Sequence, residues 1–294
     1  MTAPMWKPGS RVGRYRVLGP LGRGDPDGLF EVLDDAGRRF ALRSPIGDLD
    51  DGGDAVTSQF LPVADALRSL AHLNLVALFD VFVDGGQLFL VTERVPGRTL
   101  ATAIDAVIGP RQALVIAHQI LDAAAHAHAG GQVHRELQPS KILLVAMVGW
   151  ELVKVADFGL GTLIDEAVLA FGAGALIGSV QRPAAAYMAP EQVLGRSVDA
   201  RTDLYSIGVM LFEMLTGRPP FPDRDPDLVQ QLHVRVPPPK LDEICRGAPW
   251  CTPQVLALVE TALAKDREAR YPTAFAMQGA VDAAFGSLQH LPPE

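Results

Sequence analysis

Short apolar runs, separated by clusters of Gly and Asp, dominate the first third of the chain. Such spacing is typical of half-buried strands joined by turns. The pattern predicts strands at 15–18, 28–32 and 39–43. It also predicts a hairpin in which strands at 75–83 and 87–95 flank the turn Asp84-Gly85-Gly86.

Helical periodicity appears within this region and takes over after Pro96-Gly97. Apolar residues three and four apart predict a helix within 58–73, and Pro62 must lie in its first turn. An Ala-rich periodic stretch predicts a helix at 111–129 that ends at Gly130-Gly131. Further predictions are short strands at 142–145 and 152–156, a buried helix at 204–215 and helices within 252–288. The order of elements therefore predicts an α+β chain with a strand-rich first third and a helix-rich remainder.

Composition and charge narrow the class of protein. The chain has 294 residues, of which 48% are apolar and 20% charged, so it can bury a sizeable core. Asp and Glu outnumber Lys and Arg by 34 to 26, which gives a formal net charge of -8. An electrostatic field of this sign repels phosphate backbones and anionic membrane surfaces. We therefore expect neither nucleic acid nor a membrane as a partner.

No segment of the sequence resembles an export signal or a membrane anchor. Residues 1–16 lack the apolar run of a signal peptide. The longest apolar stretch, 167–178, contains glycines and is too short to cross a bilayer. Cys245 and Cys251 are too few for a disulfide framework, so we expect ordinary reduced thiols. These features predict a cytoplasmic protein without a membrane span.

Five strings of residues occur in a fixed order along the chain. They are His134-Arg-Glu-Leu-Gln-Pro-Ser-Lys-Ile-Leu-Leu144, Asp157-Phe-Gly159, Ala189-Pro-Glu191, Asp203-Leu-Tyr-Ser-Ile-Gly208 and Lys265-Asp-Arg-Glu-Ala-Arg270. Their order and spacing resemble the protein kinase family, specifically the bacterial Ser/Thr kinases of eukaryotic type. The resemblance covers almost the whole chain, as a single kinase-like domain at 13–284. It implies a bilobal α+β fold, with an N-terminal extension at 1–12, an antiparallel-sheet N-lobe at 13–95 and a helical C-lobe at 96–294.

The resemblance assigns scaffold and pocket roles to residues that match the family. It implies that Glu191 pairs with Arg270, and that Asp203 holds the backbone of the catalytic loop. An apolar stack between the lobes would consist of Leu67, Leu78, His134 and Phe158. The adenine of ATP would lie among Leu29, Ala41 and Leu143, with the hinge from Glu93 to Val95 and Thr92 beside the pocket.

The positions that handle phosphate depart from the family pattern. The glycine-rich loop corresponds to Gly22-Arg-Gly24-Asp-Pro-Asp-Gly28, in which Asp27, or Gly28 with one residue inserted, stands for the third glycine. Its two aspartates place negative charge near a would-be triphosphate. The strand lysine is replaced by Arg43, which keeps the charge but has a different shape. The glutamate that should orient this side chain falls on Val63.

The catalytic loop and the metal ligands depart further. Glu136 stands where the family has the aspartate that orients the substrate hydroxyl, and its extra methylene moves the carboxylate by roughly 1 Å. Gln138 replaces the lysine of this loop, and Lys141 replaces a metal-binding asparagine. An ammonium cannot ligate a cation; a less favoured alternative is that Lys141 supplies the charge of the second metal. Asp157 is retained, and either holds Mg²⁺ on the ATP phosphates or is idle.

The activation segment also lacks a hydroxyl side chain that the family pattern contains. Ala184 replaces the threonine that contacts the catalytic loop. Between residues 160 and 188 the remaining hydroxyls are those of Thr162, Ser179 and Tyr187. The segment is therefore poorly suited to switching by phosphorylation.

Together these departures predict a pseudokinase, a regulatory or scaffolding module with little or no phosphotransferase activity and at most weak binding of ATP and Mg²⁺. Its partners would be proteins, such as an active kinase or another signalling protein. Two alternatives stay open. One is a degenerate but active Ser/Thr kinase, with Glu136 as base, Asp157 as metal ligand and Arg43 as phosphate clamp. The other is a sensor that binds ATP without transferring its phosphate.

Overall fold

The computed structural model describes residues 6–21, 28–46, 62–104, 108–171 and 184–291, and of 166–171 only the backbone. The chain forms two compact units. The first contains residues 1–72, 76–96 and 159–182, and the second contains residues 73–75, 97–158 and 183–294. Within the described ranges, every helix is too short or too polar to cross a membrane.

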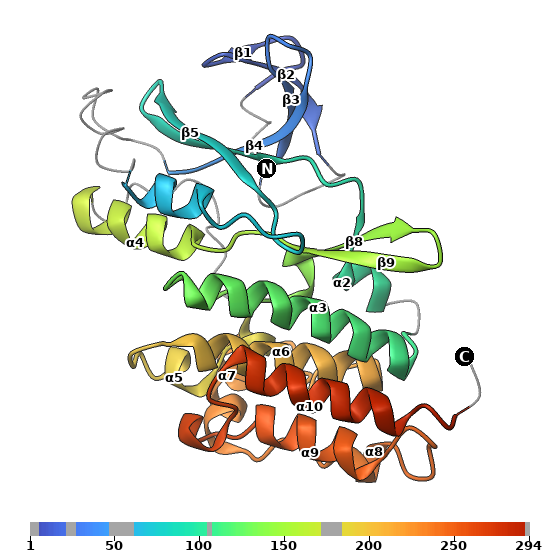
Figure 1. The fold of residues 1–294 in the computed structure, drawn as a ribbon. Helices are drawn as coiled ribbons and strands as arrows, with labels where there is room; N and C mark the ends of the chain where they lie inside the picture. Colours follow the sequence, from blue (N-terminus) through green and yellow to red (C-terminus); the bar gives the residue numbers. More distant parts are fainter. Residues whose placement is uncertain (1–5, 22–27, 47–61, 105–107, 172–183, 292–294) are drawn as a thin grey trace. The chain divides into compact units, whose positions relative to one another are not determined.

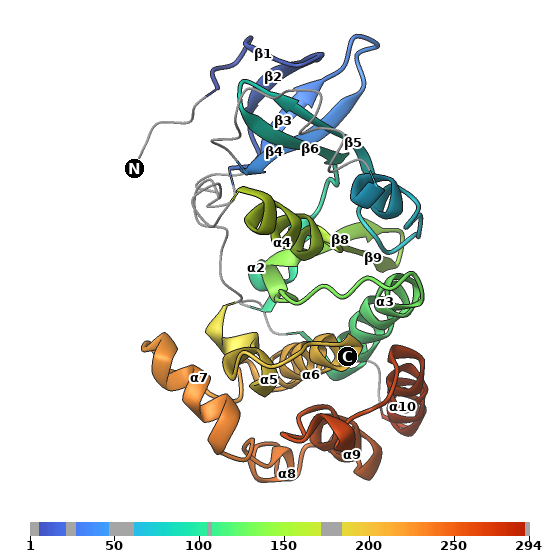
Figure 2. The same cartoon turned by 90° about the vertical axis from the view of Figure 1, so that its left-hand side faces the viewer.

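A six-stranded antiparallel sheet forms the body of the first unit, in the order β1-β2-β3-β4-β6-β5 (Figures 1 and 2). Its strands are β1 (Arg11–Val12), β2 (Tyr15–Pro20), β3 (Phe30–Leu33), β4 (Arg39–Ile46), β5 (Leu78–Asp84) and β6 (Gln87–Glu93). The strands and the hairpin predicted from the sequence are confirmed, with ends that differ by a few residues.

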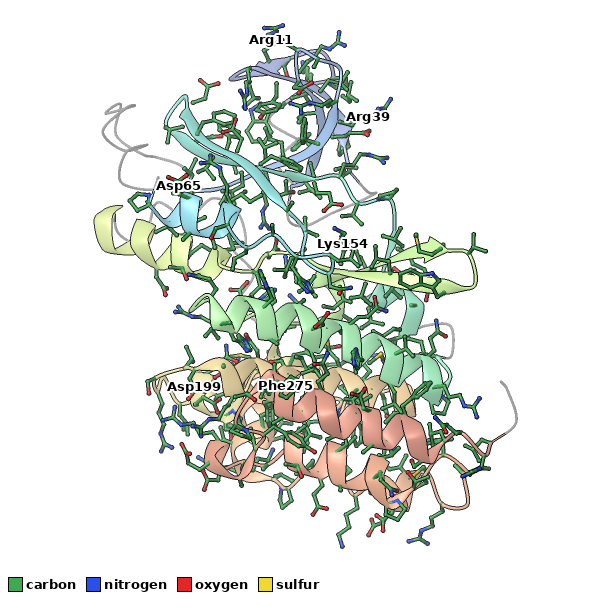
Figure 3. The ribbon with its side chains drawn as sticks, in the orientation of Figure 1. Arg11, Arg39, Asp65, Lys154, Asp199 and Phe275 are labelled. Carbon is green, nitrogen blue, oxygen red and sulfur yellow. A yellow bond between two sulfur atoms is a disulfide. The ribbon has the colours of Figure 1, made fainter. Side chains whose placement is uncertain are left out.

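The two faces of this sheet belong to separate apolar clusters, because successive side chains of a strand point to opposite sides. The first cluster gathers Val12, Tyr15, Val17, Phe30, Val32, Phe40, Leu42, Phe89 and Val91. Since Phe40 and Leu42 of β4 pack here, Ala41 and Arg43 lie on the other face. Charged side chains such as Arg11 and Arg39 are exposed at the rim of the sheet (Figure 3).

Two helices cover the other face of the sheet, and their side chains complete the second apolar cluster. One is helical over residues 62–68, the described part of the helix predicted within 58–73; residues 58–61 lie outside the described ranges. The other is α4 (Leu160–Phe171). The second cluster consists of Ile46, Ala64, Leu67, Val81, Leu88, Leu90, Leu160, Leu163 and Ile164. Asp65, on the first of these helices, is exposed (Figure 3).

Helix α4 is one of the elements that the sequence pattern missed. The lobe bounds 13–95 and 96–294 stay a prediction, and the contacts of α4 group it with the unit that contains the sheet. The physical reason is its apolar face, because Leu160, Leu163 and Ile164 recur three and four residues apart and pack in the second cluster. Gly159 has a left-handed φ of +77°, and a Cβ there would collide with Leu67, so glycine suits both the backbone and the packing.

The second unit is built around helices α3 (Pro110–Ala129) and α6 (Ala200–Thr216), which pack against each other. Helix α10 lies beside α3 in both views (Figures 1 and 2). Side chains are buried around most of α6, as predicted for 204–215. A Cβ at Gly208 would lie 2.7 Å from the Cβ of Ala262, so this glycine permits the close approach of α6 and α9. Further helices are α2 (Leu100–Ile104), α5 (Pro190–Val193), α7 (Pro226–Arg235), α8 (Leu241–Ile244), α9 (Pro253–Ala262) and α10 (Ala274–Ser287).

A small antiparallel sheet completes the second unit. It consists of β7 (Arg98–Thr99), β8 (Ile142–Met147) and β9 (Trp150–Val155) in that order. Short 3-10 turns lie at η1 (Pro139–Lys141), η3 (Ala185–Tyr187) and η4 (Arg267–Ala269). The start of β8 and the end of β9 lie at the loop that follows α3. The predicted catalytic loop from His134 to Lys141 therefore lies next to Asp157.

Cys245 and Cys251 form a disulfide, which corrects the expectation of reduced thiols. The turn after α8 folds back through bonds from the N–H of Ala248 to the carbonyl of Cys245 and from the N–H of Cys251 to that of Ala248. It brings the two Cα atoms to 6.2 Å, within the range of a disulfide. Sequence spacing did not reveal the pair because a separation of six residues is compatible with many turn conformations.

Candidate functional site

One buried carboxylate holds the loop that follows α3. Asp203, in the first turn of α6, accepts hydrogen bonds from the N–H groups of His134 and Arg135, both at 2.8 Å. The ring Nε2 of His128 lies 2.8 Å from the same carboxylate. Arg135 has a left-handed φ of +69°, a strained conformation for a residue with a side chain, so the loop needs anchoring. The scaffold role implied for Asp203 is confirmed.

His134 links this loop to the segment that leads into Asp157. Its ring packs edge-on against Phe158 at 4.8 Å between centroids, and its Nε2 lies 2.8 Å from the carbonyl oxygen of Ala156. The N–H of Glu136 donates to Nδ1 at 3.3 Å. Burial lowers the pKa of His134, although the nearby carboxylates oppose this shift. A neutral imidazole with its proton on Nε2 satisfies both contacts.

Glu191 and Arg270 form the buried ion pair that the resemblance implies. The guanidinium donates to both carboxylate oxygens, at 2.8 and 2.9 Å, and its side chain is 0% exposed. Burial alone would raise the pKa of Glu191, but the hydrogen bonds and charge of Arg270 outweigh it and lower that pKa. The hydroxyl of Thr202 also donates to this carboxylate, at 2.8 Å. The pair is confirmed as part of the core of the second unit.

Glu136 and Gln138 lie on the loop fixed by Asp203. Glu136 is half-buried, and its backbone is held by His134. Gln138 is buried, and among the described residues its side-chain Nε2 has no hydrogen-bond partner. The position that carries a lysine in the family pattern therefore offers a neutral donor here. It contributes no positive charge to the site.

Lys141 and Asp157 meet in an ion pair of 2.9 Å between Nζ and Oδ2. Their side chains are 8% and 11% exposed, so the pair is largely desolvated. Lys141 ends the η1 turn, and Asp157 follows β9 by two residues. The structure therefore brings together two residues that the sequence separates by a hairpin.

The predicted nucleotide residues of the first unit lie on its central strands. Ala41 is buried and pairs in register with Thr92, while Arg43 pairs with Leu90 and is also buried. Leu29, Glu93 and Val95 are half-buried at the ends of β3 and β6. Gly22 and Gly24 lie outside the described residues, and Leu143 lies on β8 of the second unit.

Val63 stands at the position of the family glutamate, and it packs against the second apolar cluster. Leu67, one turn further along the same helix, is buried in that cluster, and Leu78 is partly buried against it. This is the sheet face on which Arg43 also lies. An apolar side chain at this position matches its surroundings, because α4 supplies apolar neighbours there.

Gln192 is a site residue that the sequence analysis missed. Its amide oxygen accepts the N–H of Ala189 at 3.0 Å, and its Nε2 donates to the carbonyl of Arg135 at 2.6 Å. It thereby ties α5 to the catalytic loop, a link that the methyl group of Ala184 cannot make. No local pattern distinguishes Gln192 from an exposed helical glutamine.

Two hydrogen bonds hold Tyr187 in place. Its hydroxyl donates to Glu213 at 2.6 Å, and its carbonyl accepts a bond from the hydroxyl of Ser206 at 2.8 Å. Burial and the neighbouring carboxylate raise the pKa of this phenol. Its hydroxyl is thus engaged in the fold, whereas Ser179 lies outside the described residues.

Comparisons with known proteins agree with this arrangement. The family model described as "Protein kinase domain" matches residues 15–281. Serine/threonine-protein kinase Pkn1 of Myxococcus xanthus is 34% identical over 94% of this chain, which spans 39% of that protein. Serine/threonine-protein kinase PksC of Streptomyces coelicolor is 33% identical over 96% of this chain, which spans 50% of that protein. The chain thus covers about two fifths to half of the length of these relatives.

A solved structure shows the same fold. The crystal structure of the Mycobacterium tuberculosis PknI kinase domain matches 95% of this chain and 99% of that domain, with a TM-score of 0.71 and 21% sequence identity. The predicted α+β class, with an antiparallel-sheet N-lobe and a helical C-lobe, is confirmed. The ordered strings, the buried Glu191–Arg270 pair and the loop anchored by Asp203 all fit this fold. The chain belongs to the protein kinase domain family, among relatives that are bacterial Ser/Thr kinases.

Proposed function

We propose that this kinase domain is a pseudokinase, a regulatory or scaffolding module with little or no phosphotransferase activity and at most weak binding of ATP. Phosphoryl transfer depends on positioned charges rather than on covalent chemistry by the protein. The proposal therefore depends on whether the charged groups that do this work are present and oriented. A cytoplasmic location, inferred from composition, stays a prediction.

The packing of Val63 carries the proposal. In active kinases a glutamate of this helix orients the strand cation toward phosphate. Here Val63 packs against the second apolar cluster, to which α4 contributes Leu160, Leu163 and Ile164. A carboxylate in this place would be taken out of water among apolar groups, which is costly unless it finds a partner. The apolar cluster and the missing carboxylate are thus consistent with each other, because the residue that pairs with the strand cation in the family is a valine here.

The catalytic loop supports the same conclusion. Glu136 begins from a backbone fixed by His134, so its longer side chain has to place the carboxylate differently from an aspartate. Displacement of a catalytic group by about 1 Å can cost on the order of a hundredfold in rate, or about 2.7 kcal/mol of barrier. Gln138 removes a positive charge from the same loop. The change at Glu136 affects the orientation of the substrate hydroxyl, and the change at Gln138 affects the charge near the transferred phosphoryl group.

Transfer of labelled γ-phosphate tests the proposal directly. The purified chain is incubated with ATP and either Mg²⁺ or Mn²⁺, with a generic protein substrate and with the chain itself as substrate. An active bacterial Ser/Thr kinase domain serves as the positive control. We expect no incorporation above that of heat-denatured chain. Incorporation that is abolished by both Asp157→Ala and Glu136→Gln would overturn the pseudokinase assignment.

Thermal unfolding with ATP separates weak binding from sensing. At millimolar ATP we expect the melting temperature to rise by no more than about 2 °C. A larger shift without phosphate transfer would instead support the alternative of a nucleotide sensor. The proposed regulatory role predicts that the chain changes the rate of an active kinase or another signalling protein from the same genome.

The alternative of a degenerate but active Ser/Thr kinase is favoured by two observations. The curated relatives bear the names of Ser/Thr kinases, and both Glu136 and Asp157 keep a carboxylate. In that case Glu136 would orient the substrate hydroxyl and Arg43 would clamp phosphate. The transfer assay distinguishes the two functions.

A further inference from the structure

The hairpin of β8 and β9 determines which residue faces Asp157. Residues pair in an unbroken antiparallel register from Met147 with Trp150 to Ile142 with Val155. One step beyond, the N–H of Ala156 donates to the carbonyl of Lys141 at 2.9 Å. Asp157 comes next in the chain, and its Oδ2 lies 2.9 Å from Nζ of Lys141.

Both partners are fixed at the backbone. The N–H of Lys141 donates to the carbonyl of Gln138 at 2.9 Å, which closes the η1 turn. Ala156 is held at its N–H by Lys141 and at its carbonyl by the ring of His134. Asp157 itself adopts a left-handed φ of +71°, which aspartate tolerates better than most residues do. The 2.9 Å ion pair is therefore part of a rigid arrangement rather than a chance contact of two flexible side chains.

A divalent cation does not fit this arrangement. Mg²⁺ requires oxygen ligands in near-octahedral geometry. The residue opposite Asp157 presents an ammonium, which has three donors and no lone pair. Oδ2 of Asp157 already accepts a contact from that ammonium, and the two side chains are about nine-tenths buried. Binding of Mg²⁺ to Asp157 would push the ammonium away from its counter-ion, and a buried charge without a partner is strongly unfavourable.

Among the described residues, no other acidic or metal-ligating cluster offers a substitute site. Within the parts of the chain that the structure describes, no group of three or more His, Cys, Asp or Glu side chains is placed to hold a metal. We propose that the ammonium of Lys141 takes the place of a divalent cation at Asp157, so that this domain carries a built-in positive charge there and binds no Mg²⁺ at that carboxylate. This inference goes beyond the pseudokinase function and does not depend on it, because it concerns the metal alone.

Binding of Mn²⁺ to the whole chain tests the proposal without ATP. The purified protein is freed of metal with a chelator, and free Mn²⁺ is then followed by electron paramagnetic resonance during titration. We expect no saturable binding by the native chain. We also expect its melting temperature to change by less than about 1 °C between zero and 10 mM MgCl₂, relative to NaCl of equal ionic strength. Saturable Mn²⁺ binding that Asp157→Asn abolishes would overturn the proposal.

The Lys141→Asn variant gives the positive half of the test. It removes the ammonium, frees the Asp157 carboxylate and adds an amide oxygen. We expect saturable Mn²⁺ binding, and a rise in melting temperature of about 3–5 °C at Mg²⁺ ten times above its Kd. The double variant Lys141→Asn with Asp157→Asn should lose both effects. If Lys141→Asn folds but binds no more Mn²⁺ than the native chain, the ammonium is not what excludes the metal, and the proposal fails.

A matched control removes a different lysine, one that lies on the hairpin that follows Lys141. Lys154 lies on β9 (Figure 3), and its Nζ donates to the carbonyl of Leu75 at 3.2 Å. Lys154→Asn makes the same change of net charge without touching the pair at Asp157. We expect it to leave Mn²⁺ binding at the native level. A gain equal to that of Lys141→Asn would show a general charge effect and would overturn the specific role of Lys141. If Lys141→Asn fails to fold, the comparison of native chain with Asp157→Asn still decides the question.

Discussion

Replacement of Glu191 by alanine should destabilise the second unit strongly. All five N–H groups of Arg270 have acceptors, two of which are oxygens of Glu191 and three of which are backbone carbonyls. Glu191→Ala leaves two of these donors and the hydroxyl of Thr202 without the carboxylate. Removal of one partner of a buried ion pair typically costs about 3–5 kcal/mol. For a unit of this size the melting temperature should fall by about 6–20 °C.

Urea unfolding, followed by circular dichroism, measures this loss. Glu268→Ala is the control, because it breaks an ion pair with Arg201 in which the Glu268 side chain is 66% exposed. We expect this control to leave the unfolding midpoint unchanged, since exposed pairs contribute little. If Glu191→Ala lowered the midpoint no more than Glu268→Ala does, the argument that burial gives this pair its weight would be refuted.

The Glu191–Arg270 pair also predicts how the free energy of unfolding depends on pH. The pKa of Glu191 is raised by burial and lowered by Arg270, with a net shift below the ordinary 4.5. A depressed carboxylate pKa gives stability that is present above the unfolded-state pKa and is lost as the pH falls through the folded-state pKa. The difference in unfolding free energy between native chain and Glu191→Ala should thus be constant near neutral pH and shrink as the pH falls below 4.5. A difference that grew on acidification would contradict the assigned sign.

Leu163→Ala should lower the free energy of unfolding by about 2–5 kcal/mol in urea unfolding, because Leu163 is 1% exposed within the second cluster. As a control, Val148→Ala should have no effect, because Val148 is 99% exposed. Tyr187→Phe should cost about 1–3 kcal/mol by the same measurement, since it removes the 2.6 Å bond to Glu213; a neutral result would mean that this bond adds nothing. A reducing agent should lower the stability of the native chain by about 2 kcal/mol and leave Cys245→Ser unchanged, and equal responses of the two proteins would exclude the disulfide as the cause.

Local features of the sequence were enough for the elements whose pattern reflects short-range physics. Short apolar runs between Gly and Asp clusters predicted five of the six strands of the first sheet, and the turn at Asp84-Gly85-Gly86 placed the hairpin. Helix α3 followed from its periodicity and its terminal glycines, and α6 from its continuous apolar character. The family strings then placed Asp203 at the catalytic loop. These predictions succeeded because backbone conformation and the burial of one face depend mainly on near neighbours in the chain.

Tertiary packing decided the rest. The sequence by itself determined that Lys141 replaces a metal ligand and that Val63 replaces a carboxylate. Only the structure decided that Lys141 forms an ion pair with Asp157 beyond the end of the β8–β9 hairpin, and that α4 and Val63 pack in one apolar cluster. The physical reason is that ion pairs and apolar clusters join residues far apart in the chain. Which residues meet is set by register and by the faces that must be buried together, and no local pattern records this.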